Sequence, residues 1–540
     1  MERAMSCAAS HAPQYDVAVI GAGFAGLYAL HRLRELGLRV IGVEKGEDVG
    51  GVWYWNRYPG ARCDCESYYY SYSFSHELER DWRWSLRYSE QPEILRYLNH
   101  VADRFDLRPH IRFSTTLRAA RFDEVTGCWT LSFDHGPPLI ARYVVSAMGC
   151  LSEIKTPDIP GLENYRGKVL HTAAWPYQGA TLAGKRVGVI GTGASGVQVI
   201  SRIAPEVAQL TVFQRTANWV IPVWNGPMAE RFQDWVQAHY SEIRQRCFTS
   251  PGGVPFPAPE HAALDLPDSQ RAAVLEEFWA KGGIRFFSAF SDVFTHYEAN
   301  ELVCAFVRDY IRRTVRNPAV AERLIPKDHP IGTKRPPMDD EYYKMFNRQN
   351  VRLVDLRTDP IIGFTADSLV TSEGAHLFDT LILATGFDAL TGSLLAVDIR
   401  GRGGLPLREA WAEGARSLLG LAVAGFPNLF LVTGPLSPSV LANMPTAIEQ
   451  HVNWIADCLQ ELRARGAHTI EPLAKPQEEW TRHVAEVAEA TLYRDSRSWY
   501  FGSNVPGKPR QFGVYVGGFG NYADKCRQVA ASGYDGFAIR

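Results

Sequence analysis

The sequence predicts an α/β protein in which two parallel-sheet units follow one another along the chain. Two glycine-rich turns, Gly21–Gly26 and Gly191–Gly196, share the spacing Gly-x-Gly-x-x-Gly. Each turn follows a short apolar run and precedes apolar residues at helical spacing, which marks a buried strand leading into a helix. A chain of 540 residues is also too long for one compact core. We therefore expect two dinucleotide-binding, Rossmann-like domains.

Composition gives no sign of a nucleic-acid or acidic-membrane partner, because the formal net charge is only −2. The nine cysteines are scattered, and only Cys63 and Cys65 lie close together. A Cys-x-Cys pair without further paired cysteines or histidines makes a poor zinc site, so we expect no metal. Reduced thiols in a cytoplasmic protein are the expectation, with a monomer or weak homo-oligomer as the assembly.

The sequence contains no apolar segment that we expect to enter a membrane. Residues 1–14 lack the apolar run of a signal peptide, so we expect an N-terminal tail there. The most apolar late stretch, residues 418–432, contains Gly420, Gly425 and Pro427 and is too short to cross a bilayer. The sequence thus predicts no contact with a membrane.

The first glycine-rich turn follows the apolar run Asp16–Ile20. In such a turn Gly21 permits the tight bend, Gly23 lets the backbone approach a pyrophosphate, and Gly26 lets helix and strand pack closely. The phosphates then bind N–H groups at the helix N-terminus. Glu44 comes 23 positions after Gly21, where a carboxylate accepts hydrogen bonds from a ribose 2′-hydroxyl and repels a 2′-phosphate. The alternative is a glycine-rich turn without a ligand.

The second turn carries a different residue at nearly the same offset. Arg215 lies 24 positions after Gly191 and follows the apolar run Leu210–Phe213. A planar guanidinium suits the 2′-phosphate of NADP, whereas the alternative is a solvated surface arginine. We therefore expect FAD in the first site and NADPH in the second. The residues predicted to hold NADPH here are Gly191, Thr192, Gly193, Ser195, Gly196, Arg215 and Thr216.

The rest of the chain predicts the domain organisation. Residues 50–70 are rich in aromatic residues and glycine, so we expect a packed loop whose charged members, Arg62 and Asp64, need partners. Two apolar runs that end in small residues, 143–149 and 378–388, are expected to carry the chain between the domains. The expected parts are a tail (1–14), a first FAD segment (15–150), an NADP domain (151–385) with a helical subdomain inserted at about 224–326, and a second FAD segment with a mobile loop (386–540).

One further motif lies between the turns. The spacing aromatic-x-Gly-x-x-x-His-x-x-x-Trp-Pro is formed by Tyr165, Gly167, His171, Trp175 and Pro176. It resembles the fingerprint of type I Baeyer–Villiger monooxygenases, which usually begin it with phenylalanine. The resemblance covers about residues 15 to 538 and is nearest in motifs to members of the phenylacetone and steroid monooxygenase type. The residues of this motif show no clear helical or strand period, so we expect the motif to form an ordered connector. We expect His171 to have a structural role in it.

The resemblance also implies roles for individual residues. Asp64, in the run PGARCD, is expected beside a catalytic arginine, and Arg335, in the run TKRPP, matches that arginine. Lys334 matches a lysine that contacts the 2′-phosphate of NADP, and Trp499 lies in a loop expected to fold against NADP. The FAD site is expected to include Gly21, Gly23, Gly26, Glu44, Trp53, Trp55, Asp64, Tyr70 and Met148.

The implied activity is an NADPH- and O2-dependent conversion of ketones to esters or lactones through a C4a-peroxyflavin. Arg335 would stabilise negative charge on the oxygen species and Asp64 would hold Arg335. A flavin enzyme that oxidises nitrogen or sulfur is the main alternative. A disulfide reductase would need a Cys-x-x-Cys pair, and a non-catalytic NADPH-binding protein would need neither Arg335 nor Asp64.

Overall fold

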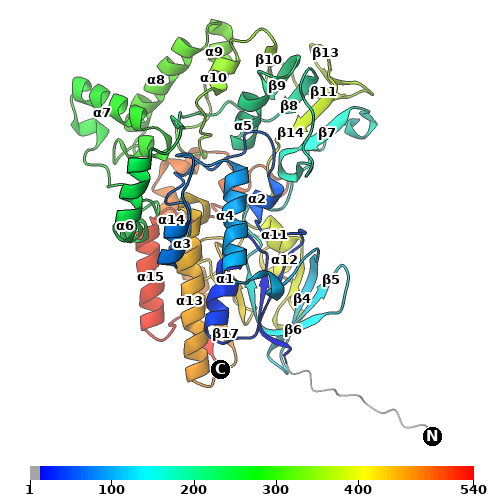
Figure 1. Cartoon of the computed structure of the whole chain (residues 1–540), viewed down its shortest axis with the longest axis vertical. Coiled ribbons are helices and arrows are strands. Elements are labelled where there is room, and N and C mark those ends of the chain that lie inside the picture. The colour runs from blue at the N-terminus through cyan, green and yellow to red at the C-terminus, as the bar shows by residue number, and fades with distance from the viewer. Residues whose placement is uncertain (1–12) are drawn as a thin grey trace.

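The computed structural model describes residues 13–540, so residues 1–12 of the expected tail lie outside the described part. Figure 1 shows two sheets at opposite ends of the long axis, with most of the long helices beside the first. The first sheet has eight strands in the order β15-β4-β5-β6-β1-β2-β3, and β16 also pairs with β6. Its strands are β1 (Tyr15–Ile20), β2 (Val40–Val43), β3 (Ile111–Arg112), β4 (Leu117–Asp123), β5 (Cys128–Phe133), β6 (Leu139–Ser146), β15 (Asp398–Arg400) and β16 (Leu429–Leu431).

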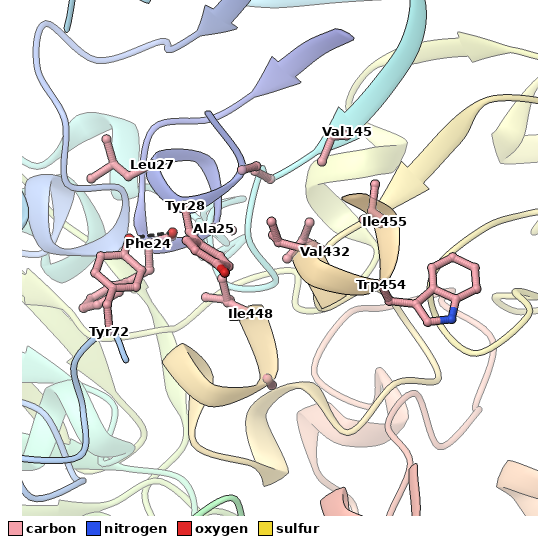
Figure 2. Close-up of a cluster of buried hydrophobic side chains, with 14 of the residues drawn as sticks. Phe24, Ala25, Leu27, Tyr28, Tyr72, Val145, Val432, Ile448, Trp454 and Ile455 are labelled. Atoms are coloured by element: carbon pink, nitrogen blue, oxygen red, sulfur yellow. Dashed lines mark hydrogen bonds between the residues drawn. The ribbon is translucent and has the colours of Figure 1, made fainter. Parts of the chain in front are cut away.

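The core of the first sheet confirms the expected strand and helix around the first glycine turn. Strand β1 lies parallel between β2 and β6, and Val17 and Val19 are fully buried. Helix α1 (Phe24–Glu35) packs against α13 (Met444–Ala464), and Figure 2 shows Tyr28 of α1 beside Ile448 of α13. Tyr72 donates a hydrogen bond of 2.6 Å to the Phe24 carbonyl beside this interface. The first turn of α1 is thereby held between the sheet and a distant part of the chain.

The second sheet has five parallel strands in the order β10-β9-β8-β14-β7. They are β7 (Lys168–His171), β8 (Arg186–Ile190), β9 (Gln209–Gln214), β10 (Val351–Asp355) and β14 (Thr380–Leu383), with α5 (Ala194–Ile203) following β8. The expectation of a connector without regular structure was wrong for Lys168–His171, because these residues pair with β14 and form an edge strand. The short length of four residues explains why no period was visible in the sequence.

Helices fill the chain between β9 and β10, as the sequence predicts for residues 224–326. They are α6 (Glu230–Thr249), α7 (Asp268–Lys281), α8 (Tyr297–Thr314) and α9 (Pro318–Leu324), followed by α10 (Tyr342–Met345). Figure 1 shows α7 to α9 at the side of the second sheet. A small antiparallel sheet that the sequence analysis did not anticipate is formed by β11 (Ile361–Phe364), β12 (Ser368–Thr371) and β13 (Gly374–Leu377).

The two segments that join the sheets lie side by side. The Lys155 N–H donates to the Gly386 carbonyl, and the Leu390 N–H donates to the Cys150 carbonyl. A bridge between Ile154 and Phe387 lies between these contacts. The outgoing and returning chains are therefore hydrogen-bonded to each other where they pass from one sheet to the other.

The remaining elements surround the first sheet or cap the crossings. They are α2 (Val52–Trp55), α3 (His76–Asp81), α4 (Gln91–Arg104), α11 (Gly392–Leu395), α12 (Leu407–Ala410), α14 (Ala474–Glu489), α15 (Phe519–Ala531), β17 (Ile470–Pro472) and β18 (Phe537–Ile539). Among residues 13–540, no helix combines the length and apolar character that crossing a membrane requires.

Candidate active site

The first glycine-rich turn has the geometry of a dinucleotide cradle. Gly21 adopts φ +108°, and a Cβ there would lie 2.4 Å from the Ala147 carbonyl oxygen. A Cβ on Gly26 would lie 1.8 Å from the Gly21 carbonyl oxygen. Helix α1 then starts from Gly23, which offers no side-chain cap. Its first N–H groups are consequently available to an anion, which fits the pyrophosphate of FAD.

Glu44 closes this cradle at the carboxyl end of β2. Its buried carboxylate accepts hydrogen bonds of 2.7 Å from the Ala22 N–H and from the Gly46 N–H. Burial raises the pKa of Glu44, and these two N–H donors oppose the rise. Each carboxylate oxygen retains acceptor capacity, so the group suits a ribose hydroxyl and disfavours a 2′-phosphate.

The second turn repeats the same backbone. Gly191 adopts φ +110°, with its added Cβ 2.4 Å from the Ala384 carbonyl oxygen, and a Cβ on Gly196 would lie 2.2 Å from the Gly191 oxygen. Helix α5 starts from Gly193 without a side-chain cap, and a Cβ on Gly193 would meet no atom within 4 Å. Ser195 lies in the first turn of α5. The open space beside Gly193 fits a second pyrophosphate.

The rim of the second site is basic. Arg215 follows β9 and is exposed, and Thr216 accepts a 2.8 Å hydrogen bond from the Thr192 hydroxyl through its carbonyl. Lys334 lies nearby, and its Nζ is 3.6 Å from Asp328 Oδ2. Burial lowers the pKa of Lys334, and repulsion by Arg215 acts in the same direction. The structure thus brings together Arg215 and Lys334, which are 119 positions apart in the sequence (215 to 334).

Arg335 and Asp64 form a bidentate ion pair between the two halves of the chain. Arg335 Nε lies 2.5 Å from Asp64 Oδ2, and Arg335 Nη2 lies 2.8 Å from Asp64 Oδ1. Burial would raise the pKa of Asp64, but the Arg335 cation lowers it below its usual value. Arg335 Nη1 donates to the Val440 carbonyl. Three of the five guanidinium N–H groups are therefore engaged and about two remain for a ligand.

The loop before this ion pair packs aromatic residues under the first site. Trp53 is buried, and its indole N–H donates a 3.2 Å hydrogen bond to the Tyr70 hydroxyl. Trp55 is partly exposed, with the Lys45 ammonium 5.2 Å from the centre of its ring. Met148 follows β6 and is partly buried. Trp53 and Tyr70 therefore lie side by side, and Trp55 lies beside Lys45, the residue that follows Glu44.

The loop with Trp499 is fastened to the crossing between the domains. The Trp499 ring packs 4.3 Å from the Tyr500 ring, centroid to centroid. Lys508 pairs with Asp388, and the Asn504 amide donates a 2.8 Å hydrogen bond to the Phe387 carbonyl. These contacts place the loop against the returning crossing.

Three residues that the sequence did not predict also belong to the site. Tyr500 is buried beside Arg335, and burial raises its pKa to about 12 although the Arg335 cation opposes the rise. Asp328 and Arg357 join the basic rim, with 3.3 Å between Arg357 Nη2 and Asp328 Oδ2. Arg357 follows β10 as Arg215 follows β9, but the sequence does not show that these two strands are neighbours.

The structure also shows the contacts of His171 and Tyr165, two residues of the motif between the glycine-rich turns. His171 accepts a hydrogen bond from the Ala173 N–H through Nδ1 and lies 3.2 Å from the Thr385 hydroxyl through Nε2. The Tyr165 hydroxyl donates to the Phe378 carbonyl at 2.9 Å. Both contacts lie within the second sheet and its crossings, as expected for a structural role. His329, which follows the helical insertion, is buried and packs near Trp219.

Comparison with known proteins places this site in a family. A family model described as flavin-binding monooxygenase-like matches residues 14–228. A Baeyer–Villiger monooxygenase of Pseudooceanicola batsensis is 42% identical over 96% of this chain and 95% of its own. A solved steroid monooxygenase bound to NADP is 50% identical, with a TM-score of 0.93 over 97% of this chain and 99% of the other. The phenazine N-monooxygenase PhzNO1 of Lysobacter antibioticus is 41% identical over 97% of both chains.

The fold, the two glycine-rich turns and the similarity to known proteins together define the chain as a flavin-dependent monooxygenase with two Rossmann-type domains. Within that class the chain belongs to the Baeyer–Villiger monooxygenase family. The predicted fold class is confirmed, as are the cofactors FAD and NADPH. The predicted activity, oxidation of ketones to esters or lactones, is confirmed at the level of the family.

Proposed function

We propose that this chain oxidises a small-molecule ketone and that Arg335, held by Asp64, is its catalytic cation. The observation that carries this assignment is the bidentate ion pair, which together with the bond to the Val440 carbonyl leaves about two guanidinium N–H groups for a ligand. Side chains exposed by only 30% for Arg335 and 23% for Asp64 place the pair in partial shelter from water. An always-protonated donor so placed favours negative charge that develops on oxygen.

The chain's own groups divide the work between them. Bound FAD, once reduced by NADPH, supplies the activated oxygen. Arg335 donates hydrogen bonds to negatively charged oxygen, and Asp64 fixes the direction of the guanidinium. The loop of Trp499 contributes Tyr500, which is buried beside Arg335, and shelter from water on this side strengthens the electrostatic effect of Arg335. Tyr500 adds a neutral hydroxyl beside the cation.

Replacing Arg335 by alanine tests the assignment. The Arg335→Ala variant is expected to bind FAD and to be reduced by NADPH, while ester formation falls about 10²–10³-fold or more. Flavin absorbance follows reduction, and mass spectrometry of products follows oxygen insertion across a panel of linear, cyclic, aryl and steroid ketones. An Arg121→Ala variant is the matched control, because Arg121 pairs with Asp398 on the surface. Ester formation at the wild-type rate by Arg335→Ala would remove Arg335 from the mechanism.

Oxidation of nitrogen or sulfur is the second candidate. The similarity to a phenazine N-monooxygenase supports it, since that relative matches nearly the whole chain. The same assay decides between the two when phenazines and thioethers are added to the panel. A product that gains one oxygen on nitrogen or sulfur, with no ester from any ketone, would favour this second candidate.

We also propose the wider setting of the enzyme. Domain limits near residues 150 and 386 are supported by the crossing, where β6 ends at Ser146 and β14 ends at Leu383. A cytoplasmic location and a monomer or weak homo-oligomer are proposed, with the buried free thiols of the described cysteines as support for the former. Fluorescence microscopy of a tagged chain and light scattering test these two proposals.

A further inference from the structure

Two cysteines flank the aspartate that holds Arg335. Cys63 and Cys65 are free thiols, each 5% exposed, and Asp64 lies between them. The two sulfur atoms and a carboxylate oxygen of Asp64 all lie within 4.8 Å of one another. The Cys65 N–H also donates a 3.3 Å hydrogen bond to Cys63 Sγ. The loop therefore holds both thiols on the same side of the chain.

The backbone at this point allows the two thiols to be joined. Two residues of fully extended chain span about 7 Å at most, which is also the limit that a disulfide can bridge between Cα atoms. The chain bends at Asp64 and Cys65, and a bend shortens this span. A disulfide between Cys63 and Cys65 thus needs a rotation of side chains and a local adjustment of the loop.

The Cys65 thiol also contacts the ion pair of the proposed active site. Its Sγ lies 3.8 Å from Asp64 Oδ1, and the S–H group donates to this oxygen. The same oxygen lies 2.8 Å from Arg335 Nη2. A change in the bonding of Cys65 therefore alters the surroundings of the carboxylate that orients Arg335.

Burial decides which oxidants reach these thiols. It raises the pKa of Cys63, and contact with the Cys65 thiol adds to the rise, so Cys63 stays protonated near neutral pH. A buried, protonated thiol reacts slowly with oxidants in the solvent. Cys63 lies close to Tyr70, a residue expected beside FAD. The oxidant that these thiols meet at high local concentration is therefore one that forms at the flavin.

We propose that Cys63 and Cys65 form a disulfide when the enzyme consumes NADPH without a ketone, and that this bond slows oxygen insertion by disturbing the pair of Asp64 and Arg335. The inference rests on the proposed role of Arg335. Without a ketone, the two electrons of NADPH reduce O2 to hydrogen peroxide. This peroxide is the oxidant of the two thiols.

The oxidation balances in two steps. The sulfur of one cysteine attacks the peroxide, whose O–O bond breaks, and water leaves while a sulfenic acid remains on that sulfur. The second sulfur then displaces the hydroxyl group as water, and the S–S bond forms. Two thiols and one hydrogen peroxide thus give one disulfide and two water molecules.

The bond is expected to be reversible and to act on catalysis. A disulfide between residues two positions apart closes a small, strained ring, and strained disulfides are readily reduced by dithiols. Its formation removes the S–H donor from Asp64 Oδ1 and draws Cys65 Sγ toward Cys63. A displacement of about 1 Å in a catalytic group can cost roughly 100-fold in rate.

The test incubates the FAD-loaded enzyme with NADPH and air, without a ketone, and compares it with an anaerobic sample. Free thiols are then alkylated in denaturant, and trypsin cleavage after Arg62 and Arg80 leaves both cysteines in one peptide. In air we expect this peptide to lack two hydrogen atoms and to resist alkylation. Ester formation is expected to fall about 10–100-fold, while NADPH still reduces the flavin, and a dithiol should restore it.

A serine in place of Cys65 removes one partner of the bond and keeps a hydroxyl donor for Asp64. Cys65→Ser is expected to form ester near the wild-type rate and to resist the reversible loss, and Cys63→Ser is the second variant for the same test. Cys128→Ser is the matched control, because Cys128 is buried on β5 with its Sγ 3.4 Å from the Thr126 carbonyl. This control should lose activity as the wild type does.

Several outcomes would overturn the inference. Both thiols could remain free after incubation in air, or Cys65 could be found joined to Cys247, its neighbour on α6. A disulfide that leaves ester formation unchanged would exclude the effect on Arg335. If the wild-type enzyme forms no ester from any ketone, the proposed function fails, whereas the mass of the peptide still tests the disulfide.

Discussion

The two glycine-rich turns have nearly the same backbone but opposite charge at the ribose end. Gly21 and Gly191 adopt φ values of +108° and +110°. A Cβ added to either residue would lie 2.4 Å from the carbonyl oxygen of an alanine. Beyond the next strand, Glu44 is buried whereas Arg215 is exposed. We therefore expect the backbone to set where a pyrophosphate lies and the side chains at the ribose end to select the dinucleotide.

The difference in burial matches a difference in use. Glu44 is fixed by two backbone N–H donors, as suits a cofactor that stays bound. Arg215, Lys334 and Arg357 form a rim that is open to solvent on one side, as suits a cofactor that enters and leaves. The first site is thus built into the core and the second at its edge.

The largest effect is expected from glycine substitutions that break one cradle and leave the other intact. In Gly26→Ala the new Cβ would lie 1.8 Å from a backbone oxygen, so we expect loss of bound FAD. In Gly196→Ala, where the distance is 2.2 Å, we expect a protein that retains FAD and loses NADPH binding by about 100-fold or more. Flavin absorbance after purification and titration with NADP+ measure the two effects.

Gly193→Ala is the matched variant for the second cradle. Its Cβ meets no atom within 4 Å, so the fold is expected to tolerate it, and only the close approach of the pyrophosphate is blocked. Thermal unfolding at the wild-type temperature together with weakened NADP+ binding is the expected result. Unchanged NADP+ binding by both Gly193→Ala and Gly196→Ala would contradict the assignment of the second turn.

A smaller effect is expected at the ribose end. Arg215→Ala is expected to raise KM for NADPH roughly 10–100-fold, because a charged hydrogen bond to phosphate is lost, and to leave KM for NADH nearly unchanged. Steady-state oxidation of the two cofactors measures the ratio. An equal change in both KM values would refute a 2′-phosphate contact, and Arg352→Ala serves as the exposed control on the neighbouring strand.

Local patterns predicted the cradles because their physics is local. A glycine turn, its strand and its helix occupy about thirty residues, and steric rules fix the role of each glycine. The helical insertion expected at about residues 224–326 was likewise predicted from local spacing, and α6, α7, α8 and α9 lie within it. The four-residue strand β7 was missed because a strand that short shows no alternation.

Local patterns could not predict contacts between residues that lie far apart in the sequence. The pairing of Asp64 with Arg335 spans 271 positions and was expected only through family resemblance. The rim residues Asp328 and Arg357 were missed, since no period in the sequence reports that β9 and β10 are neighbours. Long-range pairing depends on strand order, which local propensity does not encode.

The smallest effect concerns acid stability, through a buried histidine next to the first sheet. His451, on α13 beside the first sheet, is fully buried, accepts a 2.8 Å hydrogen bond from the Thr433 N–H and lies 2.9 Å from the Tyr522 hydroxyl. Burial lowers its pKa from 6.5 to about 3. Between these values the unfolded chain binds a proton that the folded chain does not, so stability present above pH 6.5 is lost as pH falls. From pH 6.5 to 5 the loss is roughly 1.5 kcal/mol.

Denaturant unfolding followed by flavin release measures this loss at each pH. In His451→Asn the whole curve is expected to shift downward, because the contacts to Thr433 and Tyr522 change, but the contribution of His451 to the pH slope should disappear. The control variant His135→Gln removes an exposed histidine and should keep the wild-type slope. A slope in His451→Asn as steep as in the wild type would show that another group controls acid release of FAD.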